Sequence, residues 1–210
     1  DTVRSIAEHL SEEIRNEYSI TDTGARIAIE ETAKPEKALE RNLSGKIADL
    51  LFTSPFGVYA MSSVIPGVVE TSDNLAIVNL NEEELSVVWS IRSSIESAKL
   101  NLAYRIATLA ERFGLSAIIS GDYPAWQPDP ESEFTKEVAE AYERIEGRKP
   151  VITAIHAGLE CGIINEKIEG MDSLSIGPNL FDVHSVNEHV EADSAERTSA
   201  FVKSMLKEIR

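Results

Sequence analysis

The run GDYPAWQPDP at residues 121–130 places the strongest constraint on how this chain can fold. It contains three prolines and a glycine within ten residues. Proline lacks the amide hydrogen that helices and strands both use, so neither element can continue through the run. The run therefore predicts a boundary near residue 121, and the two sides of it show different patterns of apolar residues.

The part before the boundary, residues 1–121, mixes helical and extended patterns. Apolar residues recur at helical spacing over residues 3–17, 39–51 and 94–113, and Gly114 is suited to end the third helix. Alternation and apolar runs predict strands at residues 25–29, 58–61, 68–70, 75–79, 85–91 and 115–120. This order predicts an α+β layer, with helices on one face of a largely antiparallel sheet.

The part after the boundary, residues 122–210, alternates helix and strand. The pattern predicts helices at residues 132–145, from about 159 and at the C-terminus, and strands at 151–155 and 174–176. Such alternation favours the edge of a mostly parallel, helix-covered sheet, so the fold class is α/β. The part is about half of the ~150 residues typical of such a domain, and we expect it to belong to something larger.

The charge and cysteine content exclude several classes of protein. The chain carries 20 Lys and Arg against 36 Asp and Glu, a net charge of -16, which disfavours nucleic acids and anionic lipid surfaces as partners. Its apolar runs are far shorter than the ~20 residues of a membrane-spanning helix. Cys161, the single cysteine, cannot form an internal disulfide, and no leader opens the chain. We expect a cytoplasmic protein.

The run IHAGLECG at residues 155–162 has three possible interpretations: a catalytic elbow, a metal site or a tight turn. Backbone amides at a helix N-terminus could bind an anion there, with Gly158 allowing close approach and Glu160 accepting a substrate amine or a proton. Alternatively, the run is a buried turn in which Cys161 fills apolar space. The residues by themselves leave these alternatives open.

Arg92 and His184 are the other candidate site residues. Arg92 lies where a predicted strand meets a helix, and its guanidinium could bind a carboxylate through two hydrogen bonds or be a surface charge. His184 and His189 lie in a polar loop. Each could be a surface residue or a metal ligand. The sequence has no HExxH, no His-x-Asp and no cysteine pair, so most ligands of any metal site are not recognisable.

Six motifs in register resemble the C-terminal half of the aminoacyl-histidine dipeptidases. This family, also called peptidase D or Xaa-His or beta-alanyl-histidine dipeptidase, is a branch of the di-zinc metallopeptidases. The motifs are IPGVVETSDNL (65–75), IRSS (91–94), GDYPAW (121–126), AIHAGLECG (154–162), SIGP (175–178) and HSVNE (184–188). The resemblance spans nearly the whole chain.

The resemblance implies an enzyme whose catalytic domain, with two zinc ions, is interrupted by a lid domain. Residues 1–121 would be the later part of the lid, and residues 122–210 the C-terminal part of the catalytic domain. His184 falls where the family keeps its last zinc ligand. Arg92 matches the lid arginine that binds the substrate carboxylate, while Gly158 and Glu160 line the substrate site. His156 is implied to have only a structural role.

The departures from the family pattern bear on activity. We expect the remaining zinc ligands, the bridging carboxylate and the general-base glutamate upstream of this chain, which would hold no catalytic residue itself. Asp73 stands where the family has asparagine, and Val186-Asn187 where Pro-Asp is usual. One histidine cannot hold a catalytic zinc, so the chain alone should not hydrolyse dipeptides. The alternative is a non-catalytic module that binds a partner or dimerises through the lid.

Overall fold

The computed structural model describes residues 2–127, 129, 131–155 and 158–208. Its contacts divide the chain into two units, Asp1–Ser44 and Gly45–Arg210, and each is described by itself below. The boundary predicted near residue 121 falls inside the second unit and stays a prediction.

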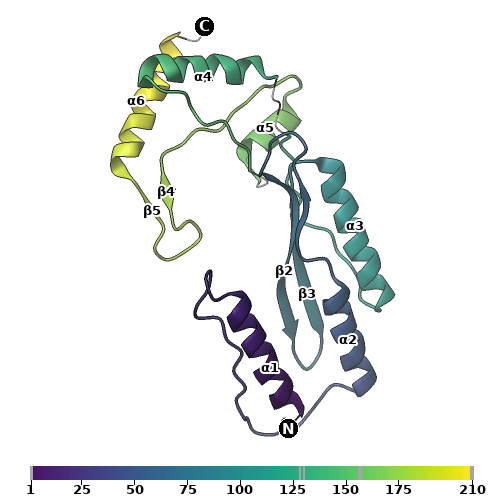
Figure 1. Ribbon diagram of the computed structural model, residues 1–210. Coiled ribbons are helices and arrows are strands. Elements are labelled where there is room, and N and C mark those ends of the chain that lie inside the picture. Colours follow the sequence, from purple (N-terminus) through teal and green to yellow (C-terminus); the bar gives the residue numbers. More distant parts are fainter. Residues whose placement is uncertain (1, 128, 130, 156–157, 209–210) are drawn as a thin grey trace. The chain divides into compact units, whose positions relative to one another are not determined.

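The first unit contains the predicted N-terminal helix. Helix α1 spans Thr2–Glu17 (Figure 1), and α2, Arg41–Thr53, begins at the end of this unit and continues into the next. The strand predicted at residues 25–29 is wrong, because no described residue of this unit forms a strand. One hydrogen bond, from the Ile27 amide to the Ser11 hydroxyl at 3.3 Å, ties this segment to α1.

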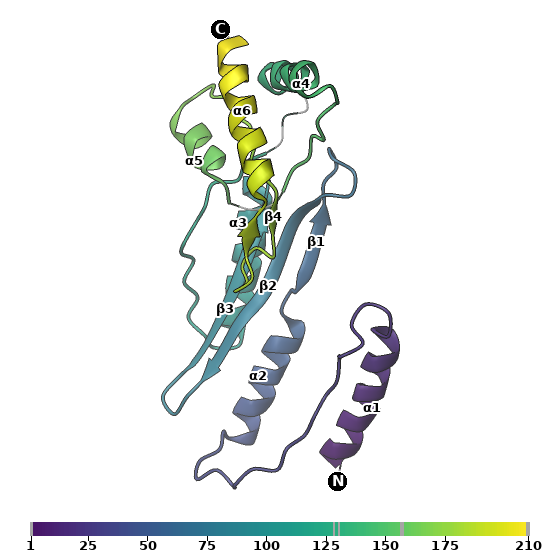
Figure 2. The same cartoon turned by 90° about the vertical axis from the view of Figure 1, so that its left-hand side faces the viewer.

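The second unit begins with a three-stranded antiparallel sheet in the order β1-β2-β3. Strand β1 is Gly57–Met61, β2 is Val69–Leu80 and β3 is Leu85–Ser93. Figure 2 shows β1 alongside β2 and the long β2–β3 hairpin. The two strands predicted at 68–70 and 75–79 are one strand, which a register shift between Leu75 and Ile77 interrupts.

The two faces of this sheet differ in burial. Thr71 and Ser93 lie opposite each other on a buried face, where their hydroxyls are 2.9 Å apart, and Asp73 is buried on the same face. Side chains alternate between faces, so Asn74 and Arg92 lie on the other, exposed face. Burial thus separates the sheet into one covered and one open surface.

Helix α3, Glu96–Arg112, packs against β3 (Figure 1) and buries a face of its own. It ends at Phe113, and Gly114 follows at φ 89°, a left-handed conformation suited to glycine. The strand predicted at 115–120 is wrong, because these residues pair with no other described segment as a strand. The antiparallel sheet with α3 confirms the predicted α+β layer in the region of these strands.

The remaining helices form a second core. Helix α4, Glu133–Glu146, packs against α6, Ala192–Glu208, around Val138, Ala141, Phe201 and Met205. The Tyr142 and Phe201 rings meet edge to face at 5.1 Å. Helix α5 is Glu160–Lys167, and a short hairpin is formed by β4, Leu180–Phe181, and β5, His189–Val190.

The parallel strands predicted after the boundary do not form among the described residues. Residues 151–155 and 174–176 have strand-like sequences, but neither segment pairs as a strand with a described neighbour. A strand needs a second backbone beside it for its hydrogen bonds, and sequence pattern alone does not provide one. None of the described helices is long and apolar enough to cross a membrane.

Candidate functional site

Residues 158–162, called the loop 158–162 below, comprise the two residues before α5 and the first three residues of that helix. They pack against another segment of the chain. A Cβ atom on Gly158 would lie 2.6 Å from the Tyr123 ring, and one on Gly162 would lie 2.8 Å from the Pro124 carbonyl oxygen. Both distances are shorter than a non-bonded contact allows, so neither position can carry a side chain unless its neighbour moves. The two glycines are therefore required by close packing on the 122–126 segment.

The two chemical groups of this loop differ in exposure. Glu160 is the first residue of α5 and is exposed, so its carboxylate is accessible beside the helix N-terminus. Cys161 is a free thiol that is only partly buried. A cysteine that fills apolar space would be fully buried, so Cys161 does not have that role. His156 lies outside the described residues.

Lys99 holds the 122–126 segment in place from the first turn of α3. Its ammonium lies 2.6 Å from the Asp122 carboxylate and 3.0 Å from the Glu96 carboxylate, and it donates to the Tyr123 carbonyl. The Glu96 carboxylate also accepts from the Ala125 amide at 3.1 Å. Burial of Lys99 opposes its charge, but the hydrogen bonds to Asp122 and Glu96 outweigh burial and raise the pKa of Lys99.

Sequence reasoning missed Lys99, although a signal was present. The buried residues of α3 are Lys99, Leu102, Ile106 and Ala110, which recur at helical spacing on one face. A lysine in such an apolar stripe is rarely buried unless it is paired. Its position predicts a charged partner, and the exposed carboxylate of Asp122 is one.

Arg92 lies near the end of β3 on the exposed face of the sheet. It pairs in register with Ser72 of β2, and the neighbouring pair is Asn74 with Ser90. This surface is polar, and the guanidinium is accessible to a ligand carboxylate. The geometry is compatible with the predicted role in carboxylate binding.

His184 lies in the turn that joins β4 to β5. Its φ is 66° and that of Asp182 is 51°, both in the left-handed region that side chains seldom adopt. The His184 amide donates to the Glu188 carboxylate at 3.1 Å, and the Ser185 amide donates to the Asp182 carbonyl at 3.1 Å. These bonds hold the turn in a strained conformation, and such strain is often found at functional sites.

The described residues do not assemble a metal site around His184. Nowhere in residues 2–127, 129, 131–155 and 158–208 do three or more His, Cys, Asp or Glu side chains come together so that they could hold an ion. His189 instead stacks on Phe181, with ring centroids 5.2 Å apart. His184 could therefore supply one ligand, but not a site.

The four predicted site residues lie on three different elements. Gly158 and Glu160 share one loop, Arg92 is on β3 and His184 is in the β4–β5 turn. Within the described residues, no hydrogen bond or ion pair joins Arg92 or His184 to the loop. The structure thus brings only Gly158 and Glu160 together.

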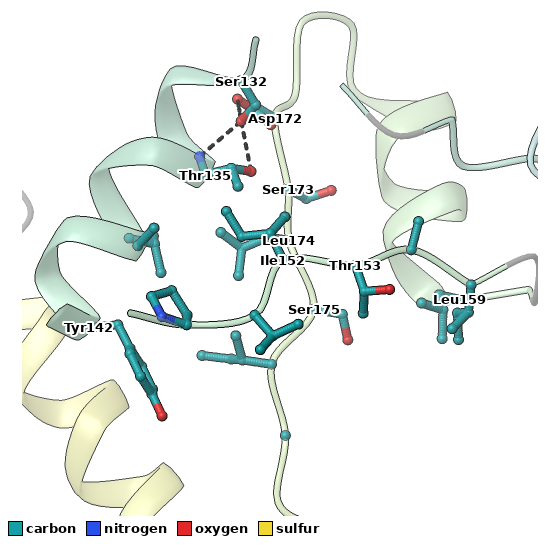
Figure 3. A pocket seen from close by; sticks show the side chains of 18 of the residues that line it. Ser132, Thr135, Tyr142, Ile152, Thr153, Leu159, Asp172, Ser173, Leu174 and Ser175 are labelled. Atoms are coloured by element: carbon teal, nitrogen blue, oxygen red, sulfur yellow. Dashed lines mark hydrogen bonds between the residues drawn. The ribbon is translucent and has the colours of Figure 1, made fainter. Parts of the chain in front are cut away.

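A cavity of about 970 Å³ lies elsewhere, between α4, α6 and the unpaired segments 151–155 and 171–177 (Figure 3). Ile152 and Leu174 line it, so the segments predicted as strands face open space. At one end the Ser132 hydroxyl donates to the Asp172 carboxylate at 2.7 Å and accepts from the Thr135 amide at 2.9 Å. None of the four predicted site residues lines this cavity.

Two dipeptidases are similar to the chain over its whole length. The cytosol non-specific dipeptidase of Escherichia coli (strain K12) is 32% identical over 209 residues, which are 100% of this chain and 43% of that protein. The crystal structure of aminoacylhistidine dipeptidase from Vibrio alginolyticus matches 100% of this chain and 43% of its own, with a TM-score of 0.85 at 32% identity. The resemblance to the aminoacyl-histidine dipeptidases is confirmed. The same structural match confirms the α/β class as a mixture of helices and small antiparallel sheets.

Other comparisons place limits on this result. The aminopeptidase PepT of Bacillus cereus ATCC 10987 matches 79% of this chain and 44% of its own with a TM-score of 0.59, but at 18% identity it shows a shared fold only. No family model matches the chain. The chain spans less than half the length of the dipeptidases that it matches. The roles of Arg92, Gly158, Glu160 and His184 remain predictions.

Proposed function

We propose that this chain is part of a cytoplasmic dipeptidase that hydrolyses Xaa-His and related dipeptides. The observation that carries the proposal is the similarity of its whole length to dipeptidases, at 32% identity in sequence and a TM-score of 0.85 in structure. The E. coli relative is named as a cytosolic enzyme. Because the chain spans 43% of each relative, the activity is proposed for a complete protein and not for this chain alone.

His184 is proposed as one ligand of a catalytic zinc ion. Its imidazole is exposed in a strained turn, and imidazole is a common zinc ligand. A catalytic zinc needs about three protein ligands, and the described part of this chain brings no such group together. These residues therefore do not fit a complete site, and we assign no catalytic step to this chain.

Three residues are proposed to contact the dipeptide. Arg92 would bind its C-terminal carboxylate, since a planar guanidinium can donate two parallel hydrogen bonds to that group. The Glu160 carboxylate, exposed at the start of α5, would accept a hydrogen bond from the substrate amine. Gly158, an exposed residue of the same loop, would line the substrate site.

A hybrid enzyme tests the metal-ligand role. This chain would replace the matched 43% of the E. coli dipeptidase, and bound zinc and hydrolysis of Ala-His would be measured. We expect chelator-sensitive hydrolysis, and loss of both activity and bound zinc in the His184→Ala variant. His9→Ala is the matched control, because His9 is an exposed imidazole on α1 that pairs with Glu13. A folded His184→Ala hybrid with full zinc content and turnover would refute the ligand role.

The chain alone provides a second test. Purified and assayed with Ala-His and carnosine-like dipeptides in the presence of zinc, it should show no hydrolysis above background. Turnover that a chelator abolishes would contradict the proposal that the remaining ligands and the general base come from outside this chain.

A non-catalytic module that dimerises is the second candidate function. One observation favours it: Ile77 and Val88 form a cross-strand pair and remain 54% and 46% exposed. Sedimentation equilibrium would distinguish the candidates. A dimer that the Val88→Asp variant dissociates, together with an inactive hybrid enzyme, would favour the module.

A further inference from the structure

In the second unit, three segments that are far apart in the sequence contact one another in turn. The first turn of α3 contacts the 122–126 segment, and that segment contacts the loop 158–162. The loop is the one proposed to line the substrate site, a role that rests on the proposed function. The contacts themselves do not depend on it.

The first connection is made by a buried charge whose donors are all used. Lys99 is 8% exposed, and an ammonium group has three N–H donors. The acceptors are the Glu96 carboxylate, the Asp122 carboxylate and the Tyr123 carbonyl. A buried charge is tolerated only with such partners, and two of the three belong to the 122–126 segment. Displacement of that segment would leave the ammonium with only the Glu96 carboxylate of these three acceptors.

The backbone before this segment does not hold it in place. Gly121 adopts a φ of 65°, and a Cβ atom built there would meet nothing within 4 Å. Glycine has the broadest range of backbone conformations, so the chain can rotate at this point. The direction in which residues 122–126 leave Gly121 is therefore set by contacts with side chains of α3. The contacts with Lys99 are made by a buried side chain.

The second connection is steric. The Tyr123 ring lies where a side chain of residue 158 would be, and the Pro124 carbonyl oxygen lies where one of residue 162 would be. The contact at Gly162 involves backbone, which cannot rotate away as a side chain can. Movement of Tyr123 and Pro124 would therefore move the loop and the first turn of α5, or open a gap beside them.

We propose that Lys99 is a positioning residue for the loop 158–162 and acts on it through the 122–126 segment. Its ammonium fixes Asp122 and Tyr123 against α3, and Tyr123 and Pro124 in turn fix Gly158 and Gly162. Loss of the ammonium frees both the segment and the loop, while the core between α4 and α6 stays as it is.

The single thiol of the chain reports on the loop. Cys161 lies in the first turn of α5 and is partly buried. Its reaction rate with a thiol reagent under native conditions depends on how often the loop opens. Hydrogen exchange followed by mass spectrometry gives a second readout for the peptides that cover residues 122–126 and 158–167.

The test compares Lys99→Met with a matched lysine. Lys99→Met removes the ammonium and keeps an unbranched side chain, and we expect Cys161 to react at least about tenfold faster. Faster exchange should be confined to residues 122–126 and 158–167. Lys136→Met is the control, because Lys136 also pairs with two carboxylates, Glu131 and Glu133, but lies on α4. It should leave both readouts unchanged.

A milder variant keeps the proposal testable if Lys99→Met fails to fold. Asp122→Asn retains the size of the side chain and removes its charge, and it should change both readouts in the same direction by a smaller factor. Faster exchange throughout α4 and α6 would indicate general destabilisation and overturn the proposal. Unchanged rates in a folded Asp122→Asn protein would overturn it as well. Neither readout requires dipeptidase activity, so failure of the proposed function is a separate outcome.

Discussion

Replacing Asp73 with asparagine should stabilise the second unit at neutral pH. Asp73 is 4% exposed as a whole residue, and neither carboxylate oxygen has a hydrogen-bond partner within the described residues. Burial raises the pKa of Asp73 from 3.8 to about 6, and the nearby Asn74 amide opposes this effect only in part. Asparagine has a similar shape and no charge to bury.

The sign of the pH dependence follows from this pKa. The folded protein binds the Asp73 proton more tightly than the unfolded chain does, so the carboxyl group contributes its full stability below about pH 3.8. That contribution is lost as pH rises through about 6. The whole shift corresponds to a loss of about 3 kcal/mol in the free energy of unfolding. Roughly half of this loss falls between pH 5 and pH 8.

Urea unfolding at pH 5 and pH 8 provides the assay. The stability advantage of Asp73→Asn over the original protein should be larger at pH 8 by about 1 kcal/mol, because asparagine does not titrate. Asp49→Asn removes an exposed carboxylate from the same unit and controls for the change in net charge. An advantage that does not differ between the two pH values, or an Asp49→Asn protein with the same pH response, would refute the reasoning.

Three further substitutions test the packing and capping contacts. Gly162→Ala should destabilise the unit by about 1–3 kcal/mol, because its Cβ atom would lie 2.8 Å from the Pro124 carbonyl oxygen. Gly45→Ala, in α2 with nothing within 4 Å, should stabilise by about 0.5–1 kcal/mol, and equal effects at both sites in thermal unfolding would contradict this contrast. Ser132→Ala should cost about 1 kcal/mol in urea unfolding, since it removes the α4 N-cap and the bond to Asp172. A neutral result would show that neither bond stabilises the fold.

The site could be predicted from sequence only in part. Short motifs identified Arg92, Gly158, Glu160 and His184 as candidates, because each motif is a local run of residues. Their arrangement in space could not be predicted, and the structure unites only Gly158 and Glu160 in one loop. The buried ammonium of Lys99 depends on Asp122, more than twenty residues away, so no local pattern describes that pair.

The sequence by itself determined the helices and the antiparallel hairpin. Helix α3 and strand β3 follow from periodicity, and β2 is predicted as two shorter strands, because a helix satisfies its hydrogen bonds locally and a hairpin pairs neighbouring segments. Tertiary structure alone decided what became of residues 115–120 and 151–155, which have strand-like sequences but no described neighbour to pair with. It also decided that Asp73 would be buried with no hydrogen bond to its carboxylate oxygens from the described residues, since the burial of a side chain depends on which distant residues fold over it.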